Sequence, residues 1–415
     1  MKKILLSMMT LVGLVLPIMA TNPVTTAMPS LTIAPDAHAA GMGDIGAATN
    51  PDLNSQHWNP SKYAFMDSKG GLTVNYTPWL TQLVNDINLA YIAGYYNMGD
   101  MAGTISGSFT YFSMGDVKLM DWDSNYGESD LGTATPNEWA IDLAYSRKLH
   151  EYLSMAVALR FMYSDLNNGI NLGSSAGGVV LDMYPAWTMA ADLSLYYRQP
   201  IALPMGESYF ALGFNLSNLG GKMTYDEGDT QHFIPANMRL GVSYELPFDD
   251  YNRLMISAEA NKMLVPTYNK SKFAVDANGN QLDGQQRKEW YSEISSPNGW
   301  WQSFCDAPGY NEVDAATGKH ISATPALEEL QEIQWGIGLE YSYNRQFFGR
   351  IGYSHENYYK GNRRYFTAGA GFKLSIFSLD FSYCVAAASN PLNNTMRFTL
   401  GFDLAGIKDL VNNRK

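Results

Sequence analysis

Residues 41–46, Gly-Met-Gly-Asp-Ile-Gly, have the G-x-G-x-x-G spacing of a loop that binds dinucleotides. Such a loop needs a strand before it, a helix after it and a surrounding βαβ unit, because the amino end of the helix holds the pyrophosphate. The neighbouring residues predict none of these elements. We therefore interpret the three glycines as points of flexible backbone that bind no ligand.

The other reactive residue types lack the spacing that catalysis or metal binding requires. The histidines are scattered along the chain, at His38, His57, His150, His232, His320 and His355. No two of them have a metal-ligand spacing, and the sequence contains neither a P-loop nor a G-x-S-x-G elbow. The adjacent acidic residues 249–250 and 328–329 fall in predicted loops, where we expect solvated carboxylates. We predict no enzymatic activity and no cofactor or metal.

The first twenty residues predict a signal peptide. Lys2 and Lys3 precede an apolar run at residues 4–16, and Ala20 offers a small residue for cleavage. An uncleaved anchor helix is the alternative, but the apolar run is short for crossing a bilayer. Because an exported protein meets an oxidising compartment, Cys305 and Cys384 are candidates for a disulfide. Both should lie on the same side of the membrane.

The amino-acid composition further restricts the class of protein to which this chain can belong. Charged residues make up 16% of the chain and aromatic residues 13%, which suits a wall that faces lipid. The net charge of −12 argues against nucleic acid as a partner. We expect the excess of acidic residues to lie in exported loops.

Apolar residues alternate with small or polar ones along much of the chain. Trp139, Ile141, Leu143 and Tyr145 share one face of a predicted strand, and Glu138, Ala140, Asp142 and Ala144 share the other. A period of two indicates a strand with a different environment on each face. The strands of a soluble β-sandwich also alternate between apolar and polar residues. However, their exposed face would be rich in Lys, Glu and Thr, whereas the non-apolar face here is dominated by Gly, Ala and Ser. We predict an all-β fold, a transmembrane antiparallel β-barrel in the outer membrane.

The pattern yields fourteen strands, an even number as expected for a bacterial barrel. They cover residues 71–79, 87–96, 102–112, 138–147, 152–163, 187–198, 207–217, 236–246, 253–262, 332–343, 347–356, 364–374, 377–385 and 394–403. Short turns at 97–100, 148–151, 247–252 and 344–346 alternate with long loops at 113–137, 164–186, 218–235 and 263–331. The alternation places both termini in the periplasm and the long loops outside. The predicted organisation is a signal peptide at 1–20, an N-terminal segment at 21–70, the barrel at 71–404 and a periplasmic tail at 405–415.

Two regions remain open to more than one interpretation. The N-terminal segment is either a disordered tail or a hatch-like insertion into the lumen or the periplasmic mouth. The predicted lumen carries charged residues that either pair with one another or line a conduit, and we favour pairing. These residues are Arg160, Asp192, Arg198, Glu245, Glu259, Glu340, Asp380 and Arg397.

The longest loop, 263–331, contains an unusual set of aromatic residues. They are Trp290, Tyr291, Trp300, Trp301, Phe304 and Tyr310. Exposed aromatic side chains either pack among themselves or bind a partner, and the sequence alone leaves both open. Residues 324–330, Thr-Pro-Ala-Leu-Glu-Glu-Leu, predict a short capped helix in the same loop.

The N-terminal segment also carries a family resemblance. Ala39-Ala40-Gly41-Met42-Gly43-Asp44 with Gly46, followed by Trp58-Asn59-Pro60, resembles the FadL-like barrel superfamily. Within this superfamily, the residue sequence from Pro35 to Gly46 is most similar to the PorV family, also called LptO, of the type IX secretion system. The resemblance implies a fourteen-stranded barrel that its N-terminal segment enters from the periplasmic side.

The family implies a non-enzymatic role in protein transport. Its members associate with the translocon pore, receive cargo by a C-terminal signal domain and carry it to the cell-surface sortase complex, which attaches it to lipopolysaccharide. Extracellular loops would bind the signal domain. The alternative is a FadL-type channel for hydrophobic small molecules, which would need an apolar pocket inside the wall. A PorQ-like relative is not separated from PorV by this motif.

Overall fold

The computed structural model describes most of the mature chain. The described residues are 24–404 except 82, 83, 85, 100, 124–126, 169–183, 227–229, 270, 314–319, 387–389 and 391. The predicted signal peptide and the predicted tail at 405–415 lie outside the described residues.

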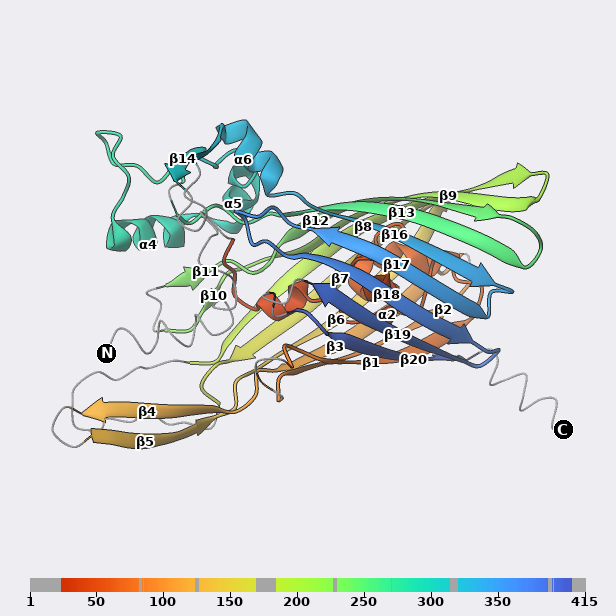
Figure 1. Ribbon diagram of the computed structural model, residues 1–415, viewed down its shortest axis with the longest axis horizontal. Helices are drawn as coiled ribbons and strands as arrows, with labels where there is room; N and C mark the ends of the chain where they lie inside the picture. Colours follow the sequence, from red (N-terminus) through yellow and green to blue (C-terminus); the bar gives the residue numbers. More distant parts are fainter. Residues whose placement is uncertain are drawn as a thin grey trace.

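Fourteen strands close into one antiparallel barrel (Figure 1). In order around the wall they are β1 Gly70–Pro78, β2 Asn88–Asn97, β3 Thr104–Ser113, β6 Asn137–His150, β7 Leu153–Asp165, β8 Ala186–Leu203, β9 Gly206–Gly220, β12 Asn237–Pro247, β13 Asn252–Met263, β16 Gln334–Tyr343, β17 Phe347–His355, β18 Arg364–Lys373, β19 Phe377–Ala386 and β20 Met396–Asp403. β1 pairs with β20 from Gly71–Asp403 to Tyr76–Phe398, which closes the wall. The predicted fourteen-stranded barrel is confirmed, with boundaries that shift by a few residues.

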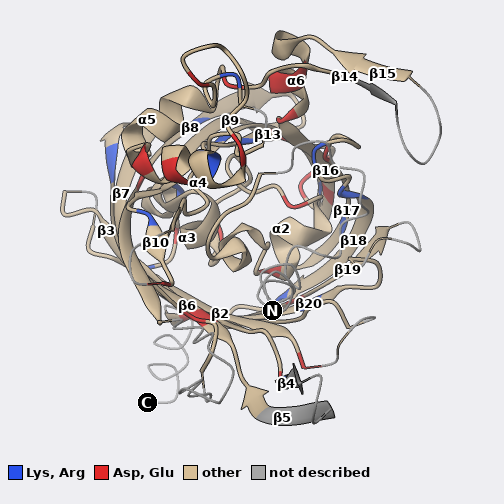
Figure 2. Cartoon of the chain, turned by 90° about the vertical axis from the view of Figure 1, so that its left-hand side faces the viewer, with Lys and Arg blue, Asp and Glu red and all other residues tan. Residues whose placement is uncertain are grey.

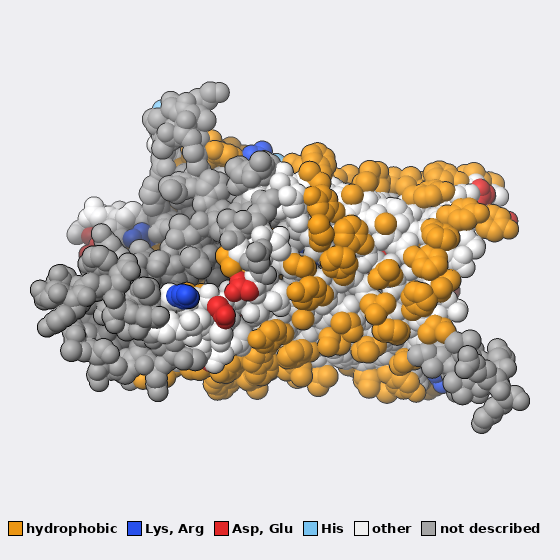
Figure 3. All heavy atoms as spheres, turned by 60° about the horizontal axis from the view of Figure 1, so that its bottom comes forward, with side chains coloured by type: hydrophobic (Ala, Val, Ile, Leu, Met, Phe, Trp, Pro, Cys, Tyr) orange, Lys and Arg blue, Asp and Glu red, His pale blue; other side chains and the backbone are white. Residues whose placement is uncertain are grey.

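The alternation along each strand separates an apolar outer face from a buried inner face. On β6, Leu143 is 71% exposed, whereas its neighbour Asp142 is 4% exposed. Figure 3 shows hydrophobic side chains over the outside of the barrel wall. This arrangement places apolar side chains toward lipid and polar ones toward the lumen, as a membrane barrel requires.

Several loops at one end of the barrel contain secondary structure of their own. Three hairpins are formed by β4 Val117–Asp123 with β5 Gly127–Ala134, β10 Met223–Thr224 with β11 Gln231–His232, and β14 Tyr310–Val313 with β15 His320–Ala323. Helices α4 Gly284–Glu293, α5 Ser296–Gln302 and α6 Pro325–Gln331 lie in the longest loop. The predicted short helix is confirmed as α6, where the Thr324 side chain accepts a hydrogen bond from Leu327 N–H.

The N-terminal segment fills the lumen. It contains the short helical turns η1 Pro29–Thr32, α2 Ala37–Gly41, α3 Ser55–Trp58 and η2 Pro60–Phe65, and Figure 2 shows α2 and α3 inside the ring of strands. Most of its side chains are buried. Of the two interpretations of this segment, the structure therefore shows an inserted plug. None of the helices among the described residues combines the length and the hydropathy needed to cross a bilayer.

The plug begins at the end of the barrel that carries the long loops. Val24 packs against Phe233 and Val265 in the long loops, whereas Asp403 pairs with Gly71 at the end with the short turns. Val24 and Asp403 therefore lie at opposite ends of the barrel, because residues 24–69 run the length of the lumen before β1 begins at the short-turn end. Which end faces the periplasm stays a prediction.

This topology predicts that the two ends of the described chain are accessible from opposite sides of the membrane. In a Cys305→Ser background, Thr25→Cys should react with a membrane-impermeant maleimide on intact cells. Leu404→Cys should react only after the outer membrane is permeabilised. Labelling of both positions from the same side would contradict the through-lumen path.

Candidate functional site: a plugged lumen beneath an outer cap

The plug touches the barrel wall backbone to backbone. Residues 41–48 run along inner positions of β9, β12, β16, β17 and β18 that carry glycine. A Cβ on Gly352 would overlap Met42 and Gly43, one on Gly213 would overlap Ala47, and one on Gly241 would lie 2.9 Å from the Ala48 Cβ. The small inner residues noted in the sequence therefore make room for the plug rather than for a wide pore.

The same contact explains the G-x-G-x-x-G stretch. Gly43 has a φ of +85°, and a Cβ there would lie 2.8 Å from the Tyr353 carbonyl oxygen. A Cβ on Gly46 would overlap the Trp58 indole. The interpretation as flexible backbone is wrong, since these glycines are buried and packed; they permit close approach and a left-handed turn. The sequence signal was the coincidence of glycines in the segment with glycines on the predicted inner faces.

Most of the predicted lumen charges pair with other charges of the wall, whereas Arg397 lies 3.9 Å from Asp44 of the plug and Arg198 lies over the Tyr209 ring. Arg160 lies 3.0 Å from Asp142 and 2.9 Å from Asp192, and Arg239 lies 3.1 Å from Glu259. Arg350 pairs with Glu340 at 2.6 Å and with Asp380 at 2.5 Å. The paired side chains are largely buried, and removing one partner would leave a buried charge without its counter-ion. The structure supports pairing over a charged conduit.

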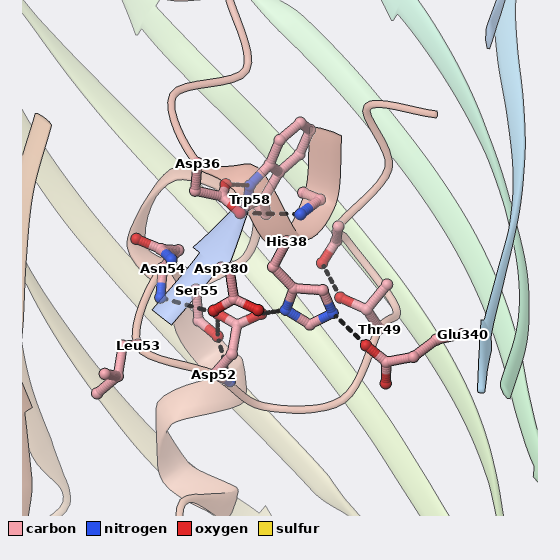
Figure 4. A network of polar contacts seen from close by, with 12 residues as sticks. Asp36, His38, Thr49, Asp52, Leu53, Asn54, Ser55, Trp58, Glu340 and Asp380 are labelled. Atoms are coloured by element: carbon pink, nitrogen blue, oxygen red, sulfur yellow. Dashed lines mark hydrogen bonds and ion pairs between the residues drawn. The ribbon is translucent and has the colours of Figure 1, made fainter. Parts of the chain in front are cut away.

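A polar network joins the plug to itself and to the wall (Figure 4). His38 lies between two carboxylates, with Nδ1 3.0 Å from Asp52 and Nε2 3.1 Å from Glu340 of β16. Trp58 Nε1 donates to Asp36 at 2.6 Å, and the other Asp36 oxygen caps α2 by accepting from Ala39 N–H. These contacts fix the plug in one position.

The plug leaves little space in the lumen. A cavity beneath the outer loops offers about 20 Å³ to the centres of water molecules, which is room for about one water. Most of its lining is polar or charged, including His57, Asp142, Arg160 and Arg239.

Two long loops form a cap over one mouth of the barrel. We define the cap as residues 218–235 and 263–331. Its hydrophobic core contains Phe233, Val265, Tyr291 and Ile294, with Val24, Tyr268 and Trp290 packed against it. Ala27 N–H of the plug donates to the Phe233 carbonyl at 2.8 Å. The plug and the cap therefore support each other.

A lysine also braces the cap. Lys222 Nζ donates to the carbonyl oxygens of Tyr291 and Ser292, each at 3.0 Å, and lies 4.4 Å from the centre of the Phe233 ring. Burial lowers the pKa of Lys222 to about 8. Sequence reasoning missed this role, because Lys222 lies far from α4 in the chain.

The structure divides the six predicted aromatic residues of the long loop into two groups. Tyr291 is buried, with its ring 5.1 Å from Phe233 and 5.0 Å from Tyr268, while Trp290, Trp300 and Tyr310 are half-buried. Trp301 and Phe304, at the end of α5, are 78% and 42% exposed. Self-packing thus accounts for most of the set, and these two side chains remain at the surface.

Salt bridges hold α6 against the barrel below. Lys262 Nζ lies 3.3 Å from Glu329 and 2.8 Å from Glu332, and Lys360 Nζ lies 2.5 Å from Glu328 and 3.0 Å from Glu332. Glu328 is only 1% exposed. The expectation of a solvated pair at 328–329 is therefore wrong, because Lys262 on β13 and Lys360 in the loop after β17 neutralise these carboxylates.

The predicted disulfide is not formed. Cys305 is exposed in the cap and Cys384 is buried on β19, and both are free. Cys384 lies on the inner face of β19 and is buried in the lumen. Cys305 lies at the surface of the cap, so the two thiols are in different environments. Among the described residues, no group of three or more His, Cys, Asp or Glu side chains is arranged to hold a metal ion.

Comparisons with known proteins identify relatives. A family model described as "Type IX secretion system protein PorV" matches residues 18–270. The structure is similar to the Pseudomonas putida toluene transporter TodX, with 11% identity, 88% of this chain and 95% of that chain covered, and a TM-score of 0.47. It is also similar to the Ralstonia pickettii toluene transporter TbuX, with 13% identity, coverage of 89% and 97%, and a TM-score of 0.44. No protein with curated annotation matches the sequence.

The glycine contacts predict a position-specific effect on one strand. Gly352→Val on β17 should lower the temperature at which the folded barrel unfolds on a heat-modifiability gel, because overpacking against Met42 and Gly43 costs about 3 kcal/mol. Gly349→Val on the same strand should have little effect, since a Cβ there meets nothing within 4 Å. Gly352→Ala provides a milder variant if valine prevents folding. Equal effects at 349 and 352 would contradict the close contact.

The cap should also become less stable as pH rises. Asp306 is buried and accepts hydrogen bonds from Thr267 N and Oγ1 at 2.6 and 3.1 Å. Burial raises the pKa of Asp306 to about 7, with the hydrogen bonds from Thr267 opposing and Glu332 and Glu329 reinforcing the shift. The closed cap therefore holds a proton that an opened cap releases, so stability falls between about pH 4 and pH 7.

Hydrogen exchange of residues 264–306, corrected for intrinsic rates, should show more opening at pH 8 than at pH 5. Asp306→Asn should flatten this dependence. An unchanged pH profile in that variant would assign the effect to another group.

Proposed function

Because the chain belongs to the PorV family of the type IX secretion system, we propose that it receives exported proteins at the translocon and carries them to the cell surface. It is an outer-membrane component of that system. In the proposed cycle it binds the C-terminal signal domain of the cargo next to the translocon pore protein. It then diffuses in the membrane to the sortase complex, where the cargo is attached to lipopolysaccharide.

The filled lumen is the observation that carries this proposal. The plug contacts the wall through backbone, and its buried charges are paired. Moving a folded or extended polypeptide through this barrel would require breaking all of these contacts. A protein of this design handles its cargo from outside, on the loops.

The cap offers the surface for that contact. Trp301 and Phe304 are exposed on a segment that the cap core and the α6 salt bridges hold in place. Aromatic side chains that are large, rigid and already ordered lose little entropy on binding, and they are frequent among the residues that dominate binding energy. We propose that these two side chains contact the signal domain of the cargo.

The alternative of a channel for hydrophobic small molecules finds no specific support. A cavity beside the plug is lined mostly by polar and charged side chains and holds about one water, which does not suit a hydrophobic ligand.

The proposal predicts that the barrel, extracted from native membranes in mild detergent, co-isolates with secreted proteins that carry the signal domain. The double variant Trp301→Ala/Phe304→Ala should bind such cargo at least tenfold more weakly, because losing an aromatic anchor costs about 2 kcal/mol. Binding is measured as the amount of cargo retained by the purified barrel.

Phe273→Ala is the matched control, since Phe273 is 40% exposed in the same loop but lies outside the 290–310 region. It should leave cargo retention unchanged. Unaltered surface display of cargo in cells that lack this barrel would refute the shuttle role. Normal retention by the double variant would refute only the proposed contact.

A further inference from the structure

A basic row lies on the outer face of the wall, at the end that carries the long loops. β16, β17 and β18 are neighbours in the barrel (Figure 1). Trp335 of β16 pairs across strands with His355 of β17, and His355 pairs with Arg364 of β18. The alternation along these strands places all three side chains on the face that contacts lipid. We call Trp335, His355 and Arg364 the rim row.

The charge of Arg364 is not neutralised by a carboxylate. Its neighbour Arg363 binds Glu356 through Nε and Nη2, each at 2.9 Å. Arg364 Nε and Nη2 donate instead to the uncharged Asn362 side chain, at 3.0 and 2.7 Å. No salt bridge of Arg364 occurs among the described residues, and residues 387–389, which follow β19 in the chain, are Ala-Ala-Ser. The guanidinium is therefore available to an anion from outside the chain.

An aromatic platform holds His355 in this row. The imidazole stacks on the Trp335 ring with centres 4.8 Å apart and planes at 20°. Its Nδ1 lies 3.1 Å from the Tyr353 hydroxyl oxygen, and the centre of the Tyr353 ring lies 4.8 Å from that of Phe366. A hydroxyl that donates to Nδ1 puts the ring proton on Nε2, which can then donate to a ligand. The row is ordered before binding, which reduces the entropy lost when a ligand binds.

Apolar side chains lie next to the rim row on the same strands. Ile337, Ile351 and Phe366 share the outer face and are 44%, 58% and 65% exposed. In a membrane barrel this band contacts acyl chains, and the aromatic residues at its edge lie at the level of the headgroups. The surface thus combines positively charged donors at headgroup level with a broad apolar area toward the middle of the membrane. This combination fits an amphiphile with an anionic head.

The edge of the apolar band differs in another part of the wall. At the same end, β3, β6, β7 and β8 carry an unbroken cross-strand row of Tyr111, Trp139, Tyr163 and Trp187. That row is a purely aromatic girdle, which suits any bilayer surface. A general girdle explains Trp335 but not the histidine and the arginine beside it, since a charged group on the lipid side costs free energy that an aromatic residue does not.

We propose that the rim row binds the phosphate of a membrane lipid whose acyl chains lie on Ile337, Ile351 and Phe366. Arg364 retains Nη1 and one Nη2 hydrogen, which are spaced for two oxygens of one phosphate, and His355 Nε2 adds a further donor. The phosphate supplies the counter-ion that the chain lacks at this position. The site faces the bilayer, so it is separate from the cargo contact proposed for the cap.

Native mass spectrometry of the purified barrel in mild detergent tests this site. The probes are dipalmitoyl phosphatidic acid and the diacylglycerol with the same acyl chains, which differ only in the phosphate. A single phosphatidic acid should stay bound to each barrel, and the diacylglycerol should be lost. Arg364→Gln should weaken the binding of phosphatidic acid about tenfold, because a charged donor to the phosphate is removed. Arg364→Lys keeps the charge without the planar fork and should give an intermediate loss.

Arg147→Gln serves as the control, since Arg147 is exposed on the outer face of β6 at the end with the short turns. It should leave lipid binding unchanged, and a heat-modifiability gel shows whether each variant is folded. Equal binding of the two lipids, an equal loss in Arg147→Gln, or full binding by Arg364→Gln would overturn the inference. Displacement of phosphatidic acid by millimolar inorganic phosphate would also overturn it, because that result would show an anion site that does not need the acyl chains.

Discussion

Close contact between two backbones organises this molecule. Residues 41–48 approach the barrel wall so closely that side chains are excluded at Gly213, Gly241 and Gly352. Polar backbone groups buried in this way need partners, and lumen side chains provide them: Glu259 accepts from Gly46 and Ala47 N–H, and Thr367 accepts from Gly43 N–H. Fourteen strands enclose more space than their own inner residues fill, and the plug occupies it.

The cap depends on this arrangement. The first described part of the plug reaches the cap, where Val24 packs against the core around Phe233 and Ala27 N–H donates to the Phe233 carbonyl. Helices α4 and α5 pack on that core, and α6 is held by Lys262 and Lys360. The filled barrel is thus a rigid scaffold that supports the surface loops. Loops that are ordered before binding lose less entropy when a partner docks, which suits a protein whose proposed work is done outside its lumen.

The sequence predicted the features that depend on local pattern. The alternation of apolar with small or polar residues predicted the strands of the wall, and the capping residue Thr324 predicted helix α6. Features that depend on distant contacts were missed or misjudged. Gly43 looked flexible because its partner, Tyr353, is more than three hundred residues away. Cys305 and Cys384 looked compatible because the sequence does not reveal how the long loop that carries Cys305 folds relative to β19. Of the six loop aromatics, only tertiary packing separates Tyr291 from Trp301.

The path of the N-terminal segment constrains the order of assembly. The chain passes from the cap at Val24 through the lumen to β1 at the opposite end, and β1 then pairs with β20. A ring that had already closed would have to admit a loose end of more than forty residues and thread it lengthwise past buried ion pairs. Folding the wall around a strand-free core avoids that step. The final β1–β20 pairing is then the event that traps the plug, and biogenesis, rather than gating, decides what the interior contains.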